Sequence, residues 1–173
     1  QARVGYRLDG AVTRTAVGRQ PASTLDLSAG QAVPGRPNFA LLRQLGRTSG
    51  SEVWLAEQPK TREQRVYKFG LDADRLRALK REATLLRVLQ DSLADTSHVV
   101  EVIDWNFELS PYFLECKYGG VTLTEWAEAH LSGLDTTARL ALFLQIADAV
   151  AAAHSVGVLH KDLKPANVLV SGE

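Results

Sequence analysis

The residues best suited to chemistry lie in one short stretch, His160 to Asn167. Within it, Asp162 can accept the proton of an attacking hydroxyl group, and Lys164 can neutralise charge on a phosphoryl group in transit. The side-chain oxygen of Asn167 can help to hold a metal ion. Phosphoryl transfer requires this combination of an acid, a cation and an amide on one loop, so the pattern predicts that reaction.

A turn of small residues upstream could cover a bound phosphate. It runs from Leu45 to Val53 between two predicted strands and contains Gly46 and Gly50. Small residues let backbone N–H groups approach phosphate oxygens closely. Taken alone, such a turn between strands is more often an ordinary hairpin.

A lysine and a glutamate between the turn and the loop could form an ion pair. Lys68 lies in a strand pattern and, if it faces inward, needs an anionic partner because an unpaired buried charge is costly. Glu82 follows fourteen residues later in a helical pattern and can supply the carboxylate. The alternative is a surface lysine and a solvated glutamate, but their order and spacing favour the pair.

Together these features resemble the protein kinase family. His160 to Asn167 matches the family's H-R-D-x-x-x-x-N catalytic loop, and the turn, the strand lysine and the helix glutamate precede it in the family's order. Lys164 and Pro165 look like the serine/threonine branch. The related bacterial small-molecule phosphotransferases share the loop but usually lack this pair. The resemblance covers about residues 38 to 173.

The resemblance implies ATP and Mg²⁺ as cofactors and a protein hydroxyl group as the acceptor. Asp162 would be the catalytic base, and Lys164 would stabilise the transferred phosphoryl group. Asn167 would bind the metal. Lys68, paired with Glu82, would hold the nucleotide phosphates. The protein substrate itself is not indicated.

The resemblance also implies where the nucleotide would lie. Pro111 to Gly120 looks like the fifth strand and hinge of a kinase, in which backbone groups near Glu115 to Lys117 would hydrogen-bond the adenine edge. The implied nucleotide-binding residues are Gly46, Gly50, Val53, Val66, Lys68, Leu114, Glu115, Lys117 and Leu169. For the apolar members, packing in the core is the alternative.

The sequence departs from the family pattern within two motifs. Thr48 and Ser51 stand where glycines are expected in the covering turn. Lys161 replaces an arginine that in many members pairs with a phosphorylated activation loop. Lysine keeps the charge but loses the bidentate geometry, which puts control by that phosphorylation in question.

A third departure concerns extent. The family's metal-binding D-F-G motif and most of its helical lobe should follow Asn167, but only six residues do. We therefore expect these residues to be part of a longer polypeptide. Alone, they are expected to bind nucleotide weakly or not at all and to be inactive.

The composition predicts a globular protein. Hydrophobic residues make up 45% of the 173 residues, which is enough for a core. Twenty basic and twenty acidic residues cancel, so nothing indicates binding to nucleic acid or to an anionic membrane. A single cysteine, Cys116, excludes an internal disulfide and fits a reducing cytoplasm. The most apolar stretch, Leu140 to Ala153, contains Gln145 and Asp148, and we expect it to be too short to span a bilayer.

Periodicity predicts an α+β order, in which a small antiparallel sheet with one helix precedes a helical region, and the resemblance implies that this is a protein-kinase-type fold. Its small antiparallel five-stranded N-lobe has one main helix, and the first helices of an incomplete helical C-lobe follow. Strands are predicted over 39–45, 52–57, 65–69, 99–105 and 112–116, and helices over 74–89, 122–129 and 136–154. The last helix carries an apolar stripe, expected to be its buried face, of Leu140, Phe143, Leu144, Ala147, Val150 and Ala151. In these residues alone, the stripe would lack a main packing partner.

Three segments are predicted. Residues 1–36 form a linker carrying one short strand, 37–117 the N-lobe and hinge, and 118–173 the start of the C-lobe. Arg3 to Leu8 is similar to the last strand of winged-helix DNA-binding domains of the response-regulator type, so the linker could include the end of such a domain.

Two alternatives to an active kinase remain. One is a pseudokinase or nucleotide-binding regulatory module, favoured by the weak glycine pattern. The other is the kinase part of a winged-helix transcription regulator, in which only a preceding domain would contact nucleic acid.

Overall fold

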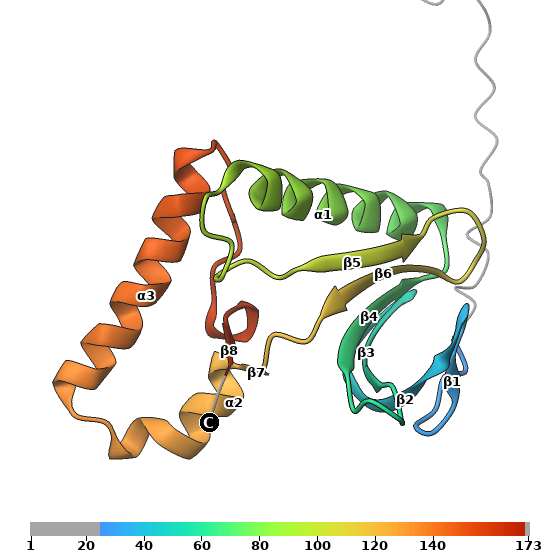
Figure 1. Cartoon of the computed structure of the whole chain (residues 1–173), viewed down its shortest axis with the longest axis horizontal. Coiled ribbons are helices and arrows are strands. Elements are labelled where there is room, and N and C mark those ends of the chain that lie inside the picture. Colours follow the sequence, from blue (N-terminus) through green and yellow to red (C-terminus); the bar gives the residue numbers. More distant parts are fainter. Residues whose placement is uncertain (1–24, 172–173) are drawn as a thin grey trace, which may run out of the picture.

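The computed structural model describes residues 25–171, and the motif Arg3 to Leu8 lies outside them. The elements are β1 (Ala32–Val33), β2 (Arg36–Thr48), β3 (Ser51–Glu57), β4 (Gln64–Gly70), α1 (Ala73–Ser92), β5 (Val102–Asn106), β6 (Tyr112–Lys117), β7 (Val121–Thr122), α2 (Leu123–His130), the 3₁₀ helix η1 (Leu131–Gly133), α3 (Thr136–Ser155), the 3₁₀ helix η2 (Pro165–Asn167) and β8 (Leu169–Val170). A six-stranded antiparallel sheet, in the order β1-β2-β3-β4-β6-β5, precedes a helical part that contains the two-stranded sheet β7-β8. Figure 1 shows α1 lying along the larger sheet.

The predicted α+β architecture is confirmed. Each of the three predicted helices and five predicted strands has its counterpart, and most bounds shift by only a few residues. The strand expected from residue 99 begins at Val102 instead. The sheet also has one strand more than the five predicted for the N-lobe, because β1 pairs with the start of β2.

The end of the segment predicted as a linker belongs to the folded lobe. Val33 in β1 is buried, and Leu25 and Leu27 pack against the same cluster. The prediction of a linker up to residue 36 therefore differs from the structure between residues 25 and 36. Leu25 and Leu27 alternate, but Val33 follows only after six residues, and Gly30, Pro34 and Gly35 around it suggest turns.

Side-chain alternation gives the larger sheet two apolar faces. The first face is an aromatic cluster, in which the Tyr67 ring contacts three phenylalanine rings. Its buried members are Val33, Phe39, Leu41, Trp54, Ala56, Tyr67, Phe69 and Phe113. The second face packs against α1 through the buried residues Leu79, Ala83, Leu114 and Cys116.

Helix α1 is positioned by its cap and its apolar stripe. The Asp72 carboxylate accepts a hydrogen bond from the backbone N–H of Arg75 at 2.8 Å, which satisfies a donor in the first turn. Leu79 and Ala83, four residues apart and so on one side of the helix, are buried against the sheet. The stripe therefore fixes which side of α1 faces the second face of the sheet.

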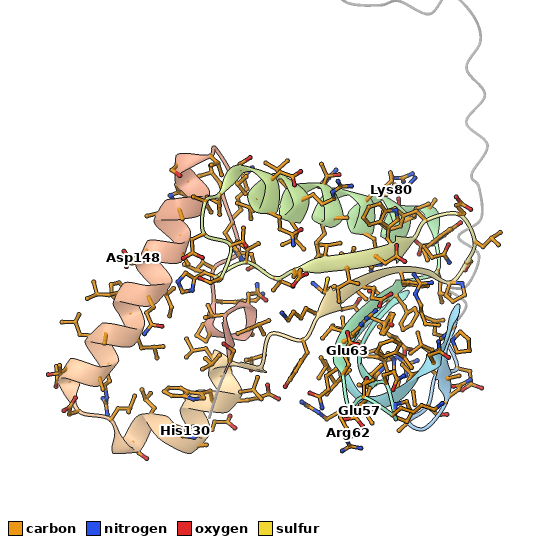
Figure 2. The ribbon with its side chains drawn as sticks, in the orientation of Figure 1. Glu57, Arg62, Glu63, Lys80, His130 and Asp148 are labelled. Carbon is orange, nitrogen blue, oxygen red and sulfur yellow. The ribbon has the colours of Figure 1, made fainter. Side chains whose placement is uncertain are left out.

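Helix α3 stands apart from the other elements. None of its residues is buried, and Leu140, Phe143 and Leu144 are 56%, 63% and 52% exposed. Figure 2 shows its side chains, Asp148 among them, along a helix that no other helix or strand covers. The prediction that this stripe is a buried face was therefore wrong for the described residues.

The length of α3 also corrects the membrane argument. The helix has 20 residues and contains an 18-residue window with a mean hydropathy of 1.3, so it is long and apolar enough to cross a bilayer, judged by length and composition alone. The expectation that the stretch is too short considered Leu140 to Ala153, but the helix extends beyond that stretch at both ends.

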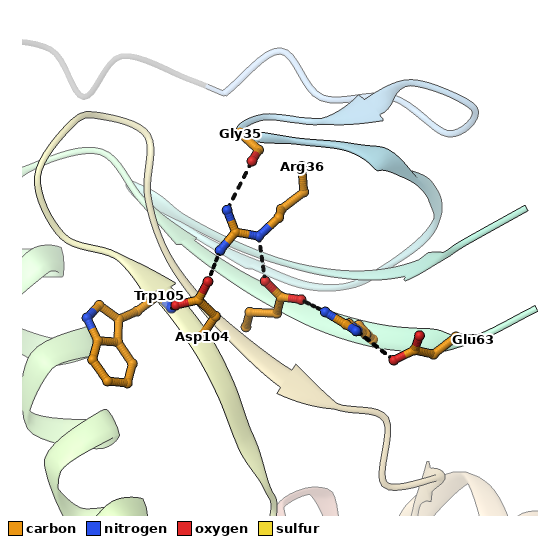
Figure 3. A network of polar contacts seen from close by, with 7 residues as sticks. Gly35, Arg36, Glu63, Asp104 and Trp105 are labelled. Atoms are coloured by element: carbon orange, nitrogen blue, oxygen red, sulfur yellow. Dashed lines mark hydrogen bonds and ion pairs between the residues drawn. The ribbon is translucent and has the colours of Figure 1, made fainter. Parts of the chain in front are cut away.

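A buried carboxylate anchors the first face of the sheet. Glu115 of β6 is fully buried, and it forms ion pairs with Arg36 of β2 and Arg65 of β4 (Figure 3). Arg36 also pairs with Asp104 of β5, and Arg65 with the exposed Glu63. This network joins four strands on the side of the sheet opposite α1.

We expect Glu115→Gln to lower the free energy of unfolding by about 2 kcal/mol, because it leaves two arginines without their shared anion. The loss should be below that of a fully buried pair, since Arg36 and Arg65 keep 30% and 20% of their side-chain surface exposed. Urea denaturation measures the change. As a control, Glu63→Gln removes an exposed partner of the same Arg65 and should cost under about 0.5 kcal/mol. Equal effects of the two variants would contradict this account.

The two-stranded sheet brings the end of the chain's described part back to the segment after β6. Val121 pairs with Val170 and Thr122 with Leu169. Gly120 has a φ of +99°, and a Cβ atom there would overlap the Val170 carbonyl oxygen. Only glycine suits this position, because it tolerates the left-handed backbone and has no side chain to collide with β8.

We therefore expect Gly120→Ala to destabilise the protein by about 2 kcal/mol or more, through backbone strain and overlap with β8. Thermal unfolding followed by circular dichroism provides the measurement. Gly133→Ala is the matched control, since a Cβ atom there meets nothing within 4 Å. A Gly120→Ala protein as stable as the control variant would show that β8 does not lie where the structure places it.

Candidate active site

Lys68 and Glu82 form an ion pair between strand β4 and helix α1. Strand alternation turns Tyr67 and Phe69 into the aromatic cluster, so Lys68 projects from the opposite face, towards α1. Glu82 directly precedes the buried Ala83 on the helix. The side chains of Lys68 and Glu82 keep 33% and 38% of their surface exposed, so the lysine can still reach a ligand.

A depression of about 240 Å³ lies beside this ion pair. Its walls come from β3, β4 and α1, and include Ser51, Val53 and Arg75 together with Lys68 and Glu82. Lys68 supplies a cation for the phosphate end of a nucleotide, Ser51 leaves room for it, and Val53 offers an apolar contact to the nucleoside.

A larger depression, of about 540 Å³, lies around Arg65 of β4, Glu101 just before β5 and Lys117 at the end of β6. Its cationic groups are already paired: Arg65 with Glu63 and Glu115, and Lys117 with Glu101. Since none of the implied catalytic residues lines it, size alone does not make it the candidate site.

The register shows which implied nucleotide-binding residues share the face of Lys68. Val53 pairs with Lys68, which in turn pairs with Leu114, so these three side chains lie on one face. Val66 lies two residues before Lys68 in β4 and therefore on the same face. The structure thus brings Val53, Val66 and Leu114 together with Lys68, although Leu114 is fully buried against α1.

Glu115 and Lys117 point the other way. Strand alternation places their side chains on the face opposite Lys68, and the Glu115 carboxylate is held by two arginines. Only their backbone groups could contact a nucleotide. The Lys117 N–H donates to the Glu101 carbonyl oxygen at 2.9 Å, so contact with adenine would require this group to exchange partners.

Cys116 lies between these two residues and faces the core. Burial raises the pKa of its thiol to about 11, so the group stays protonated near neutral pH. It is a packing residue here.

The predicted phosphate-covering turn is a tight hairpin. Thr48 pairs with Ser51, which leaves Ser49 and Gly50 as the two turn residues, and Gly50 has a φ of +76°. This left-handed backbone requires glycine at the second turn position. Gly46 lies earlier, in β2 opposite Val53, where a Cβ atom would meet nothing within 4 Å. Gly50 is therefore needed for the turn, whereas no local contact requires glycine at position 46.

The catalytic-loop residues form a cluster of their own. Lys164 Nζ donates to Asp162 Oδ2 at 2.9 Å, and Asn167 Nδ2 donates to the same oxygen at 3.0 Å and to the Asp162 carbonyl oxygen at 2.8 Å. The 3₁₀ helix η2 turns Asn167 back towards Asp162, and the Asn167 N–H donates to the Lys164 carbonyl oxygen. All three predicted catalytic-loop residues are thus brought together.

The Lys164 hydrogen bond, and then that from Asn167, hold the pKa of Asp162 below its ordinary value. The preceding Lys161 has a φ of +62°, which is uncommon for lysine. Such backbone strain is often concentrated at functional loops.

Asn167 fits part of a magnesium site. Its side-chain oxygen is a hard donor of the type that Mg²⁺ prefers, and the hydrogen bonds to Asp162 use the amide nitrogen and not this oxygen. Between residues 25 and 171, no group of three or more acidic, histidine or cysteine side chains gathers around a common point. Among the described residues, Asn167 is therefore the implied metal ligand.

Leu169 connects the loop to the hinge. Its Cδ1 atom lies 2.9 Å from where a Cβ atom of Gly119 would be, so the leucine packs directly against the backbone after β6. Leu169, one of the implied nucleotide-binding residues, therefore lies beside the segment that follows β6. No hydrogen bond or ion pair joins the Asp162 cluster to Lys68 or Glu82 within the described residues.

Sequence reasoning missed Arg75, which lies beside Lys68 in the same depression. Asp72 before a helical pattern is a recognisable cap and could have marked the helix start. Nothing in the local sequence indicates the tertiary contact of Arg75 with the hairpin.

We expect Lys164→Met to raise the pKa of Asp162 towards its ordinary value, because the strongest hydrogen bond to the carboxylate is lost. The carboxyl group would then take up its proton at higher pH than in the unaltered protein. Titration of the Asp162 carboxyl carbon by NMR measures this shift. Lys161→Met is the control and should leave the midpoint nearly unchanged. An unchanged midpoint in Lys164→Met would contradict the geometry.

Solved structures with the same fold include the kinase domain of PknI from Mycobacterium tuberculosis, crystallised as a double mutant. It is 24% identical, with a TM-score of 0.57 over 85% of this chain and 60% of that one. This likeness shows that the fold is that of a protein kinase, with the sheet and helices described above.

The curated relatives include kinases of a plant and of bacteria. CBL-interacting protein kinase 22 of Oryza sativa subsp. japonica is 31% identical over 170 residues, covering 87% of this chain and 36% of the relative. Serine/threonine-protein kinase PknD of Mycobacterium tuberculosis is 31% identical over 139 residues, covering 77% and 20%. PrkC of Bacillus subtilis is 29% identical over 147 residues, covering 82% and 22%. The chain thus spans about a third or less of the length of these relatives. A model of the protein kinase domain matches residues 39–173, the greater part of the chain, which therefore belongs to the protein kinase domain family.

Proposed function

We propose that this chain carries the nucleotide-binding lobe and catalytic loop of a serine/threonine protein kinase. The reaction is transfer of the terminal phosphoryl group of ATP to a protein hydroxyl group. The observation that carries the proposal is the Asp162 cluster, in which Lys164 and Asn167 both donate to the carboxylate. A lysine–glutamate pair occurs in many folds, but this loop has few uses other than phosphoryl transfer.

The role of each residue follows from the geometry. Since its pKa is lowered, Asp162 is ionised at neutral pH and can accept a hydrogen bond from an incoming hydroxyl group. It is a weak base, so it chiefly orients that group and takes the proton once bond formation has made it acidic. Lys164 shares the Asp162 oxygen and can swing to a phosphoryl oxygen without leaving the cluster.

The nucleotide would lie between the hairpin and the Lys68 face of the sheet. Lys68 donates to phosphate oxygens, and Glu82 holds its ammonium group in place. When bound, Mg²⁺ supplies positive charge against the phosphate oxygens. Asn167 is the residue that would hold it, through the side-chain oxygen.

The comparisons do not favour the alternatives. The relatives named above are all named as kinases, and PknD and PrkC are named as serine/threonine-protein kinases. A pseudokinase would draw support from the occupied Lys117 N–H and from Thr48 and Ser51 in place of glycines. The winged-helix alternative rests on residues outside the described range.

We also propose that this protein is cytoplasmic and does not insert into a membrane. The sole cysteine is a buried free thiol, which suits a reducing compartment. The apolar helix α3 lies within the span that matches the kinase family, between the hinge and the catalytic loop. Its stripe would then be covered by protein in the helical lobe.

We expect Asp162→Asn, made in the whole protein, to reduce phosphorylation of a generic peptide substrate by about 10²–10⁴-fold, because general base catalysis is lost. ATP affinity should stay within about twofold, since the substitution removes no phosphate ligand. Radiolabel transfer and calorimetric ATP titration give the two quantities. The control is Asp91→Asn, an exposed residue near the end of α1. Full activity in Asp162→Asn would refute the assignment, and ATP binding without any transfer by the unaltered protein would favour the pseudokinase.

A further inference from the structure

Arg75 of α1 holds the tip of the hairpin between β2 and β3. Its Nη2 atom donates to the Ser49 carbonyl oxygen at 2.6 Å, across 26 residues of sequence. Between residues 25 and 171, Arg75 forms no ion pair, and Ser49 is the only residue to which its guanidinium group donates. The guanidinium is thus committed to the hairpin and not to a neighbouring carboxylate.

The aliphatic part of Arg75 packs against two glycines. A Cβ atom at Gly70, the last residue of β4, would come within 2.7 Å of the Arg75 Cβ atom, so glycine lets the first turn of α1 approach. At Gly50, a Cβ atom would lie 3.7 Å from the Cγ and Nε atoms of Arg75, in ordinary contact. The Leu71 N–H also donates to the Gly50 carbonyl oxygen at 3.3 Å. The contact is therefore built from three segments.

The hydrogen bond sets the orientation of one peptide unit. In a trans peptide the C=O and N–H groups point in opposite directions. Because the Ser49 carbonyl points at Arg75, the Gly50 N–H points away from α1. The family pattern would place glycines at positions 48 and 51, but threonine and serine stand there. Glycines at positions 48 and 51 would let the hairpin backbone turn its N–H groups towards a phosphate. Arg75 can fix one of these peptide units in a single orientation from outside the hairpin.

The same helix carries Glu82, seven residues after Arg75 and thus about two turns away. Helix α1 therefore contacts both parts of the proposed phosphate site, Lys68 through Glu82 and the hairpin tip through Arg75. Asp72 and Glu82 are the acidic groups near this contact. Asp72 caps α1 through its Oδ1 atom, and Glu82 is paired with Lys68.

We propose that Arg75 is a positioning residue that couples the phosphate-covering hairpin to the helix bearing Glu82, so that the hairpin and Lys68 are held over the nucleotide phosphates together. This role rests on the proposed function, because it concerns a phosphate site. It assigns Arg75 no contact with the reacting atoms. Arg75 is therefore expected to affect the binding of the nucleotide phosphates and not the binding of the nucleoside.

The test compares two substitutions in the whole protein. Arg75→Met keeps the aliphatic packing on Gly50 and Gly70 but removes the donor, and Arg75→Lys keeps a cationic donor. The matched control is Arg77→Met on the same helix, where an exposed arginine pairs only with the exposed Asp74. Circular dichroism establishes that each variant is folded, and calorimetry measures the affinities for ATP and adenosine.

We expect Arg75→Met to weaken ATP binding by about tenfold while changing adenosine binding by less than about twofold, as suits the loss of one charge-assisted hydrogen bond. Arg75→Lys should restore most of the ATP affinity. Amide hydrogen exchange at Leu71, measured without nucleotide, should speed up in Arg75→Met and stay unchanged in Arg77→Met.

Unchanged ATP affinity in Arg75→Met, or an equal loss for ATP and adenosine, would overturn the role of Arg75 while leaving the proposed function intact. Failure of the unaltered protein to bind ATP would instead overturn the proposed function, and with it the role of Arg75 at a phosphate site. The two failures are therefore distinguishable in one set of titrations.

Discussion

The Lys68–Glu82 ion pair is the interaction on which the rest of the arrangement depends. It joins β4 to α1, the helix whose Leu79 and Ala83 pack on the same face of the sheet against Leu114 and Cys116 of the neighbouring β6. A lysine on that face without its carboxylate would carry an unpaired charge beside an apolar cluster. Because the pair is only partly buried, it can orient the ammonium group and still leave it accessible to a phosphate.

The two faces of the larger sheet have different roles: one stabilises the fold, and the other carries the residues of the proposed nucleotide site. One face is closed by aromatic rings and by the Glu115 network, and it offers a nucleotide no side chain. The other face carries Val53, Val66 and Lys68 towards α1 and the depression beside it. A one-residue slip in the pairing of β4 would exchange these faces, so the stability of the aromatic cluster also keeps Lys68 on the functional side.

Local sequence patterns were sufficient to predict the helices, the strands and the cluster around Asp162, because the spacing of nearby residues determines all of them. Asp162 and Asn167 are five residues apart on one loop, and Lys68 and Glu82 occupy a strand and a helix with clear periodicity. The features that could not be predicted depend on tertiary contacts between distant segments. The side chain of Glu115 turned out to face two arginines from distant strands, Arg75 reached a hairpin 26 residues away, and α3 stayed uncovered. None of these follows from a residue's immediate neighbours.

The central claim is that the hairpin with Lys68 and the loop with Asp162 serve one nucleotide, although no described contact links them. Paramagnetic broadening by ATP with Mn²⁺, which accepts the same oxygen ligands as Mg²⁺, tests this directly. A single bound Mn²⁺–ATP should broaden the backbone NMR signals of both Ser49 to Ser51 and Lys164 to Asn167 at the same occupancy. Broadening of one group without the other, or at separate concentrations, would contradict a shared site.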